Sequence, residues 1–171
     1  MLSEDELAVL TPWLPKLSET NDLRRSDHVP PAILDDVGLV PALMWLVEDF
    51  RERSGLSVIL HSKPEDAAFN DDASTAIFRI VQEGLTNVVH HAKGATQVVI
   101  ELTCTAGMCD LSILDNGQTS TSLSPRAPGR DSSGLAGIRQ RTRHLGGSAS
   151  IAAHPEGGFM IQIWVPRRSV E

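Results

Sequence analysis

Three polar side chains, Glu83, Asn87 and His91, recur at every fourth position of the segment EGLTNVVHH. In a helix they advance by only about 40° per step, so they form a stripe along the border of the apolar face. An amide oxygen in such a stripe can bind a hard cation, and a carboxylate can orient water or accept a proton. Polar residues at this spacing also form ordinary solvated helix flanks, so the stripe alone leaves both interpretations open.

Two further groups lie downstream of this stripe. Asp115, in LDNG, follows a predicted strand, where its carboxylate can accept a hydrogen bond from an exocyclic amine such as that of adenine. Asp, Asn and Gly also make ordinary Asx turns. Gly134 and Gly137 open a predicted helix, where bare backbone N–H groups and the positive end of the helix dipole attract phosphate, although glycines there also serve as a hinge. Together these features provide a metal ligand, a base-reading carboxylate and a phosphate-binding helix end.

Apolar periodicity predicts the elements that hold these groups. Helices are predicted from Asp36 to Gly55, from about Ser74 to Lys93 with Gly94 as the stop, and from Gly134 to Gly146. Strands are predicted at 56–61, 96–103, 108–114, 148–154 and 159–165, with short turns inside two hairpins. We expect two helices on one face of a mixed, mostly antiparallel sheet, which is a two-layer α+β sandwich.

Two segments fall outside this pattern. Residues 1–31 contain four prolines that interrupt any long helix, and we interpret residues 1–30 as an appendage to a domain at 31–171. Residues 117–133 contain seven Ser or Thr and almost nothing to bury. Structureless stretches this long in a compact domain are usually functional lids or disordered.

Composition excludes several functional classes. A formal charge of −7 leaves no positive field for a polyphosphate backbone, so nucleic acid is not expected as the main partner. No apolar run is long enough to cross a membrane, and nothing at the N-terminus resembles a signal peptide. Cys104 and Cys109 face each other across a predicted turn centred on Ala106 and Gly107, which makes a disulfide geometrically conceivable. We nevertheless expect reduced thiols in a cytoplasmic chain, whose parent protein can itself be membrane-bound.

The chain resembles the ATP-binding catalytic domain of bacterial sensor histidine kinases, particularly the nitrate/nitrite-sensor type, within the gyrase, chaperone and mismatch-repair ATPase superfamily. The resemblance rests on five ordered blocks, AILDDVGLVPAL, FRIVQEGLTNVVHHAKGA, LDNG, SGLAGIRQRTRHLGG and EGGFMIQIWVP. Five blocks in order are far more specific than any single glycine-rich string. The resemblance implies the Bergerat-type ATP-binding fold, and it implies that residues 1–30 are a remnant of the second dimerisation helix.

The resemblance also implies roles for single residues. Asn87 would ligate the Mg²⁺ that bridges the ATP phosphates, Glu83 would act as a base or orienting group, and Asp115 would read the adenine amine. The implied nucleotide-binding set is Asn87, His91, Lys93, Asp115, Gly117, Gly134, Leu135 and Gly137. Residues 117–133 would be the ATP lid, from which Arg126 and Arg130 would reach phosphate.

The sequence departs from the family pattern at three positions. Thr119 and Ser132 stand where family members of this type commonly have lid glycines, which predicts a stiffer lid. Phe159 follows the paired glycines of the last hairpin, where a threonine often helps to bind adenine through water. One hydroxyl is therefore missing from the expected site.

The phosphoacceptor motif of such kinases, a histidine followed by an acidic residue, does not occur in this sequence. We therefore expect a chain that binds Mg·ATP and donates the γ-phosphate to a histidine on a separate dimerisation domain, which in turn serves a response regulator. The alternative is a catalytically silent interaction module of the same fold. A serine kinase of the anti-sigma-factor type is disfavoured by the AILDDVGL stretch.

Overall fold

A computed structural model describes residues 34, 38–63, 69–119, 133–167 and 170. Its helices are α4 (Leu39–Ser54), α5 (Asp71–His91) and α6 (Ser133–His144). Its strands are β1 (Ser57–Lys63), β2 (Ala92–Lys93), β3 (Gln97–Cys104), β4 (Met108–Asp115), β5 (Gln118–Thr119), β6 (Ser148–Ala153) and β7 (Phe159–Pro166). The predicted domain boundary at residue 30 lies outside the described residues and stays a prediction.

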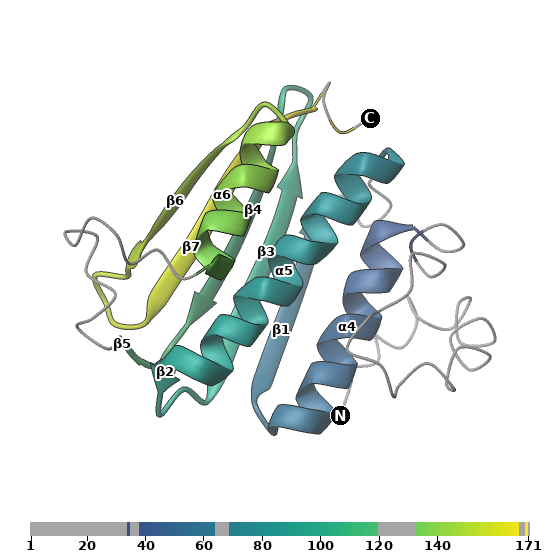
Figure 1. Ribbon diagram of the computed structural model, residues 1–171. Helices are drawn as coiled ribbons and strands as arrows, with labels where there is room; N and C mark the ends of the chain where they lie inside the picture. The colour runs from purple at the N-terminus through teal and green to yellow at the C-terminus, as the bar shows by residue number, and fades with distance from the viewer. Residues whose placement is uncertain (1–33, 35–37, 64–68, 120–132, 168–169, 171) are drawn as a thin grey trace.

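The main sheet has five strands in the order β1-β3-β4-β7-β6. β1 pairs in parallel with β3, and the other three pairings are antiparallel. All three helices lie on the same face of this sheet (Figure 1). The predicted two-layer α+β sandwich is therefore confirmed, except that three helices of the described residues, rather than two, cover the sheet.

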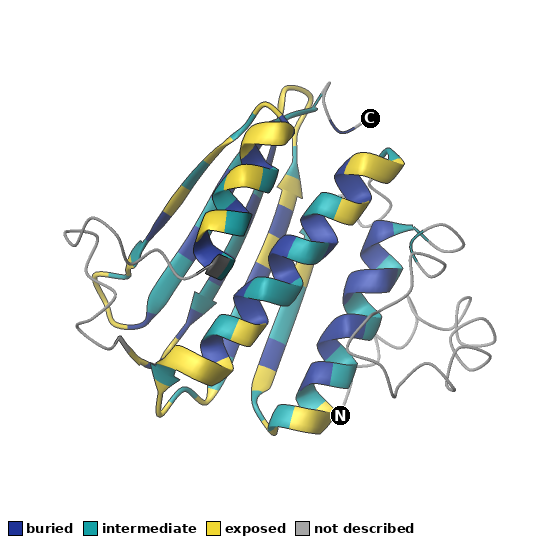
Figure 2. Cartoon of the chain, in the orientation of Figure 1, coloured by how far each residue is buried: buried dark blue, intermediate teal, exposed yellow. Residues whose placement is uncertain are grey.

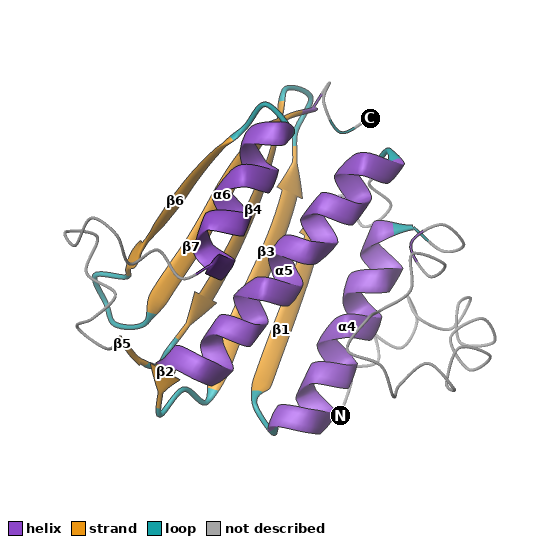
Figure 3. Ribbon diagram, viewed as in Figure 1, coloured by secondary structure: helices purple, strands orange, loops and turns teal. Residues whose placement is uncertain are grey.

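The hydrophobic core fills the space between the helices and this face of the sheet. Val98, Ile100 and Leu102 alternate along β3 and are buried, and Leu111 and Ile113 do the same along the neighbouring strand β4. The intervening residues point to the opposite face, which carries no helix in the described part of the chain (Figures 2 and 3). This period-two pattern fixes which side of each strand the helices cover.

Helix α5 begins three residues earlier than predicted and ends two residues earlier. The Asn70 side chain accepts a hydrogen bond from the Ala73 N–H at 2.9 Å, so Asn70 is the N-cap and the helix starts at Asp71. At the other end, Ala92 and Lys93 leave the helix because they pair with β5 in a separate two-stranded sheet. The predicted helical position of Lys93 is therefore wrong.

Part of the segment 117–133, which was predicted to be a loop, forms regular secondary structure. Gln118 and Thr119 form β5, and α6 begins at Ser133. Residues 120–132 lie outside the described residues, as do Arg126, Arg130 and Ser132, so the predicted lid and its two arginines stay predictions.

The two cysteines are joined in a disulfide, which contradicts the expectation of reduced thiols. The predicted hairpin explains why. Thr105 and Met108 close the turn with a backbone hydrogen bond of 2.8 Å, so Cys104 and Cys109 are direct cross-strand partners with Cα atoms 4.1 Å apart. Cysteines whose Cα atoms are more than about 7 Å apart cannot be bridged, and this register brings the two Cα atoms well within that limit.

The residues after β7 return to the start of α5. The Arg167 N–H donates to the carbonyl oxygen of Gly107 in the β3–β4 turn, and the Val170 N–H donates to the Arg167 carbonyl. Val170 is fully buried, and its own carbonyl accepts a hydrogen bond of 2.6 Å from the N–H of Asn70. The end of the described chain is thus bonded to the residue that caps α5.

The Asn70 cap gives a stability test. Asn70→Ala should lower the free energy of unfolding by about 1 kcal/mol, because the Ala73 N–H loses its side-chain acceptor. Urea denaturation would measure this loss. Asn70→Asp keeps an acceptor and should retain most of the stability, so equal losses in both variants would contradict the capping role.

Candidate functional site

A pocket that is partly open to solvent lies between the C-terminal half of α5, the first turn of α6 and the ends of β4 and β7. Its lining residues are Gly84, Asn87, Val88, His91, Ala92, Ile113, Asp115, Leu135, Phe159 and Ile161. Most of them are apolar, and Asn87, His91 and Asp115 provide the polar side chains. Small-molecule sites usually have this composition, with a few polar groups set in an apolar wall.

Asp115 is the last residue of β4, and it is only 4% exposed. Its carboxylate accepts a hydrogen bond from the Gly117 N–H at 2.8 Å and another from the Phe159 N–H. Burial raises the pKa of Asp115 above its ordinary value, and these two backbone hydrogen bonds oppose that rise without cancelling it. Because this carboxylate lines the pocket, a ligand that donates a hydrogen bond to it would offset part of the cost of burial.

Gly158 allows the last hairpin to approach Asp115. Its φ of +88° is a conformation that side-chain-bearing residues rarely adopt. A Cβ at this position would also overlap the backbone carbonyl of Asp115. The glycine pair before β7 therefore brings the Phe159 N–H within reach of the carboxylate.

Asn87 carries an unused hydrogen-bonding group within this pocket. Its Nδ2 atom is buried and has no hydrogen-bond partner among the described residues. Leaving a buried amide donor without a partner costs about 1 to 3 kcal/mol, so such groups usually have a function. The carboxamide can donate from its nitrogen to an anion and can ligate a cation through its oxygen.

Glu83 lies one turn before Asn87, next to the pocket but not in its lining. A Cβ on Gly134 would overlap the Glu83 carboxylate, which shows that this carboxylate packs against the first turn of α6. Glycine at 134 is required for that contact. The backbone N–H groups at a helix start favour a negative charge, so this position suits the carboxylate electrostatically.

Of the remaining predicted residues, one lines the pocket and the others lie outside its lining. Leu135 lines the pocket and is 8% exposed. Lys93 pairs with Gln118 between β2 and β5, and it is exposed and outside the lining. Gly117 and Gly137 are also outside the lining. Gly117 packs against Ala92, and Gly137 lies beneath the Arg141 guanidinium.

The apolar wall of the pocket was not predicted from the sequence. Ile113 and Ile161 face the pocket from β4 and β7, and Phe159 was noted only for the hydroxyl it lacks. Strand alternation identifies such residues as buried but does not show which of them border a cavity. Gly84 is a glycine inside a predicted helix, which can indicate close packing. The structure shows the reason, because a side chain there would crowd Ile113 across the helix–sheet contact.

The described residues contain no cluster of three or more His, Cys, Asp or Glu side chains that could hold a metal ion. A cation at this site would therefore depend on the Asn87 amide and on oxygens supplied by a ligand. None of the helices within the described ranges is long and apolar enough to cross a membrane.

Residues 72–169 match the family model of histidine kinase-, DNA gyrase B- and HSP90-like ATPases. The chain belongs to this family. The match spans α5, the pocket and the last hairpin, and it confirms the family expected from the sequence. The chain therefore carries the ATP-binding domain that histidine kinases share.

Sensor histidine kinases are among the relatives of this chain. The sensor histidine kinase MctS of Rhizobium johnstonii is 30% identical over 147 residues, which are 85% of this chain and 32% of that protein. The sensor histidine kinase NarS of Mycobacterium tuberculosis is 34% identical over 128 residues, or 74% of this chain and 29% of that protein. The chain thus spans about a third of these relatives.

A solved structure has the same fold. The histidine kinase domain of the blue-light activated histidine kinase EL346 of Erythrobacter litoralis aligns with a TM-score of 0.62 at 17% identity. The alignment covers 97% of this chain and 76% of that domain. At this identity the likeness supports the fold alone.

The buried Asp115 carboxyl predicts a dependence of stability on pH. Because the pKa is raised in the folded state, the folded protein keeps the Asp115 proton over a pH range in which the unfolded chain releases it. The stability that the protonated Asp115 carboxyl contributes is fully present below its ordinary pKa of 3.8. It is lost as pH rises through the higher pKa of the folded state. Wild type should therefore lose stability relative to Asp115→Asn as pH rises through this window.

Urea denaturation of both proteins at a series of pH values would measure the difference. Asp115→Ala also removes the titrating group and should show the same trend against wild type. A difference between wild type and Asp115→Asn that is constant with pH would contradict the raised pKa.

Proposed function

We propose that this chain is the catalytic ATP-binding part of a sensor histidine kinase, which holds Mg·ATP and donates its γ-phosphate to a histidine on a dimerisation domain. A single observation carries the proposal. The buried Asp115 carboxylate and the unpartnered Asn87 amide line the same apolar pocket, in a chain of the histidine kinase-like ATPase family. A carboxylate acceptor and a carboxamide in one cavity suit the amine of a purine and the metal-bound phosphates of a nucleotide.

Asp115 is proposed to select adenine. Its carboxylate accepts hydrogen bonds, and the exocyclic amine of adenine donates them. Guanine carries a carbonyl at the same ring position, which would face the carboxylate with a second acceptor. Ile113, Ile161 and Phe159 provide apolar surface for the purine ring.

Asn87 is proposed to hold the Mg²⁺ and phosphate end of the nucleotide. Its amide oxygen suits a hard cation, and its unused N–H group suits a phosphate oxygen. When bound, Mg²⁺ would neutralise charge on the phosphates, which is a large part of what phosphoryl transfer requires of an enzyme. His91 borders the same end of the pocket from α5.

Glu83 and the start of α6 are proposed to act on the transferring phosphate. The Glu83 carboxylate lies at the first turn of α6, one helical turn from Asn87. It can therefore orient or deprotonate the histidine that approaches from the partner domain. Gly134 and Leu135 would close over the nucleotide from the same turn, with further nucleotide contacts from Lys93, Gly117 and Gly137. The phosphorylated histidine would then serve a response regulator, and the site would lie in the cytoplasm.

A catalytically silent module of the same fold is the second candidate. It is favoured by Phe159, which lines the pocket at the position where related kinases often carry a threonine. Thr119 in β5 replaces a lid glycine, which restricts the backbone there. Such a module would show no metal-dependent nucleotide binding.

The adenine contact predicts the effect of Asp115→Asn on affinity. Losing a hydrogen bond to a charged group costs about 1.5 to 3 kcal/mol, so the affinity for ATP should fall about 10- to 150-fold. Isothermal titration calorimetry with ATP and GTP would measure it. GTP should bind weakly to both proteins, and unchanged ATP affinity in the variant would exclude the adenine assignment.

The metal contact predicts the effect of Asn87→Ala. Wild type should bind ATP more tightly with Mg²⁺ than without it, and this ratio should fall towards one in the variant, because the amide ligand is gone. Thr86→Ala is the matched control, since Thr86 is the exposed neighbour of Asn87 on α5 and should leave the ratio unchanged. Wild-type binding that is indifferent to Mg²⁺ would favour the silent module.

A further inference from the structure

The two edge strands of the main sheet differ in how they are protected against pairing with another strand. At one edge, the Arg51 side chain of α4 donates hydrogen bonds to the Val58 carbonyl of β1, from Nε at 2.8 Å and also from Nη2. β1 also carries His61 and Lys63. Covering groups and charges of this kind are the usual protection against pairing with another strand.

The other edge, β6, has none of these protections in the described part of the chain. Its sequence is SASIAA, with no charge, no proline and no large side chain on the open face of the sheet. Its only strand partner among the described residues is β7, and Figure 1 shows β6 at the outer edge. A strand edge presents a row of backbone N–H and C=O groups, so β6 is a template for a further strand.

From this contrast we infer that β6 is an interaction surface, and that its partner is β6 of a second copy of this chain, paired antiparallel. The two copies would form one continuous sheet with a two-fold axis at the junction. Such an axis makes each contact occur twice, which is how most homodimers are built. This inference does not depend on the proposed function.

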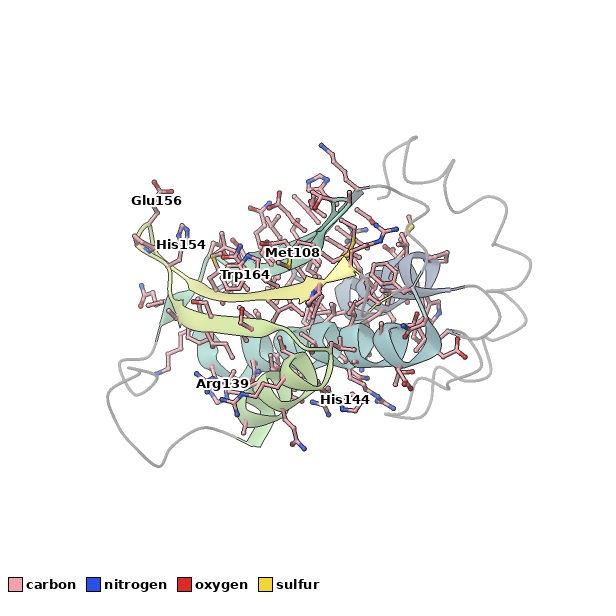
Figure 4. The ribbon with its side chains drawn as sticks, turned by 90° about the horizontal axis from the view of Figure 1, so that it is seen from above. Met108, Arg139, His144, His154, Glu156 and Trp164 are labelled. Atoms are coloured by element: carbon pink, nitrogen blue, oxygen red, sulfur yellow. A yellow bond between two sulfur atoms is a disulfide. The ribbon has the colours of Figure 1, made fainter. Side chains whose placement is uncertain are left out.

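The distribution of charge favours a second copy in the antiparallel direction. The last turn of α6, just before β6, carries Arg141, Arg143 and His144. The turn just after β6 carries Glu156, and Figure 4 shows Glu156 and His154 at one end of the strand and His144 towards the other. Antiparallel pairing brings the basic end of one copy beside the acidic turn of its partner, and it keeps the two basic helix ends apart.

The geometry of a sheet restricts the register. Facing residues in an antiparallel pair point to the same side of the sheet, whereas consecutive residues of one strand point to opposite sides. The two-fold axis must therefore lie beside one residue, which then faces its own copy, and cannot lie midway between two consecutive residues. Ser150 and Ile151 are the central residues of β6. Ser150 is exposed on the open face. It faces its own counterpart if the axis is level with Ser150, and it lies diagonal to its counterpart if the axis is level with Ile151.

A charge-pairing experiment tests this inference on the full chain. Wild type should show reversible, concentration-dependent dimers in sedimentation velocity. Ser150→Lys and Ser150→Glu should each weaken self-association, because two like charges would lie across the junction. An equimolar mixture of the two variants should associate about tenfold more tightly than either alone, because opposite charges then face each other.

Thr103→Lys is the matched control. Thr103 is exposed on the same open face, but it lies in β3, which has neighbours on both sides. This variant should dimerise like wild type. Amide hydrogen exchange in residues 148–153 should also slow as wild-type concentration rises.

Three outcomes would overturn the inference. They are a wild type that stays monomeric at all concentrations, a Ser150→Lys variant that dimerises like wild type, and a mixture that associates no better than its components. A monomeric wild type that captures an added extended peptide along β6 would instead assign this edge to a different partner.

Discussion

The pocket depends on a carboxylate that is buried at the end of a central strand. Asp115 accepts hydrogen bonds from Gly117 and Phe159, so one side chain ties the end of β4 to the turn before β5 and to the start of β7. Removing an ionised group from water is unfavourable unless it has hydrogen-bond partners, and here the backbone supplies them. The carboxylate therefore stays beside the cavity, and the chain must fold around it with Gly158 where a side chain would overlap.

Helix α5 combines two functions on one surface. Its central face carries Ile77, Ile80 and Val81 into the core, and its border carries Glu83 and Asn87 towards α6 and the pocket. The helix must be held tightly on the sheet for this border to face the cavity. Gly84 provides the close approach, since a side chain there would crowd Ile113 of β4.

Much of this fold could be predicted because its elements are strongly periodic. The alternation in β3, β4 and β7 gives both hairpins and their buried faces, and Gly55 marks the end of α4. Helix ends and long-range pairing were less predictable. Lys93 leaves α5 because β5 pairs with it, and no local pattern shows that contact. Likewise Asn87, Asp115 and Leu135 could be proposed as site residues, but the apolar wall that joins them depends on how the helices pack over the sheet.

The return of the chain to Asn70 has a practical consequence for shortened forms of this protein. A version that stopped at the end of β7 would keep every strand of the sheet, yet it would lack Val170, whose buried side chain and carbonyl support the residue that caps α5. The helix that presents Glu83 and Asn87 would then lose an anchor at the end farthest from the pocket. A few residues beyond the last strand thus belong to the folding unit as fully as the sheet does.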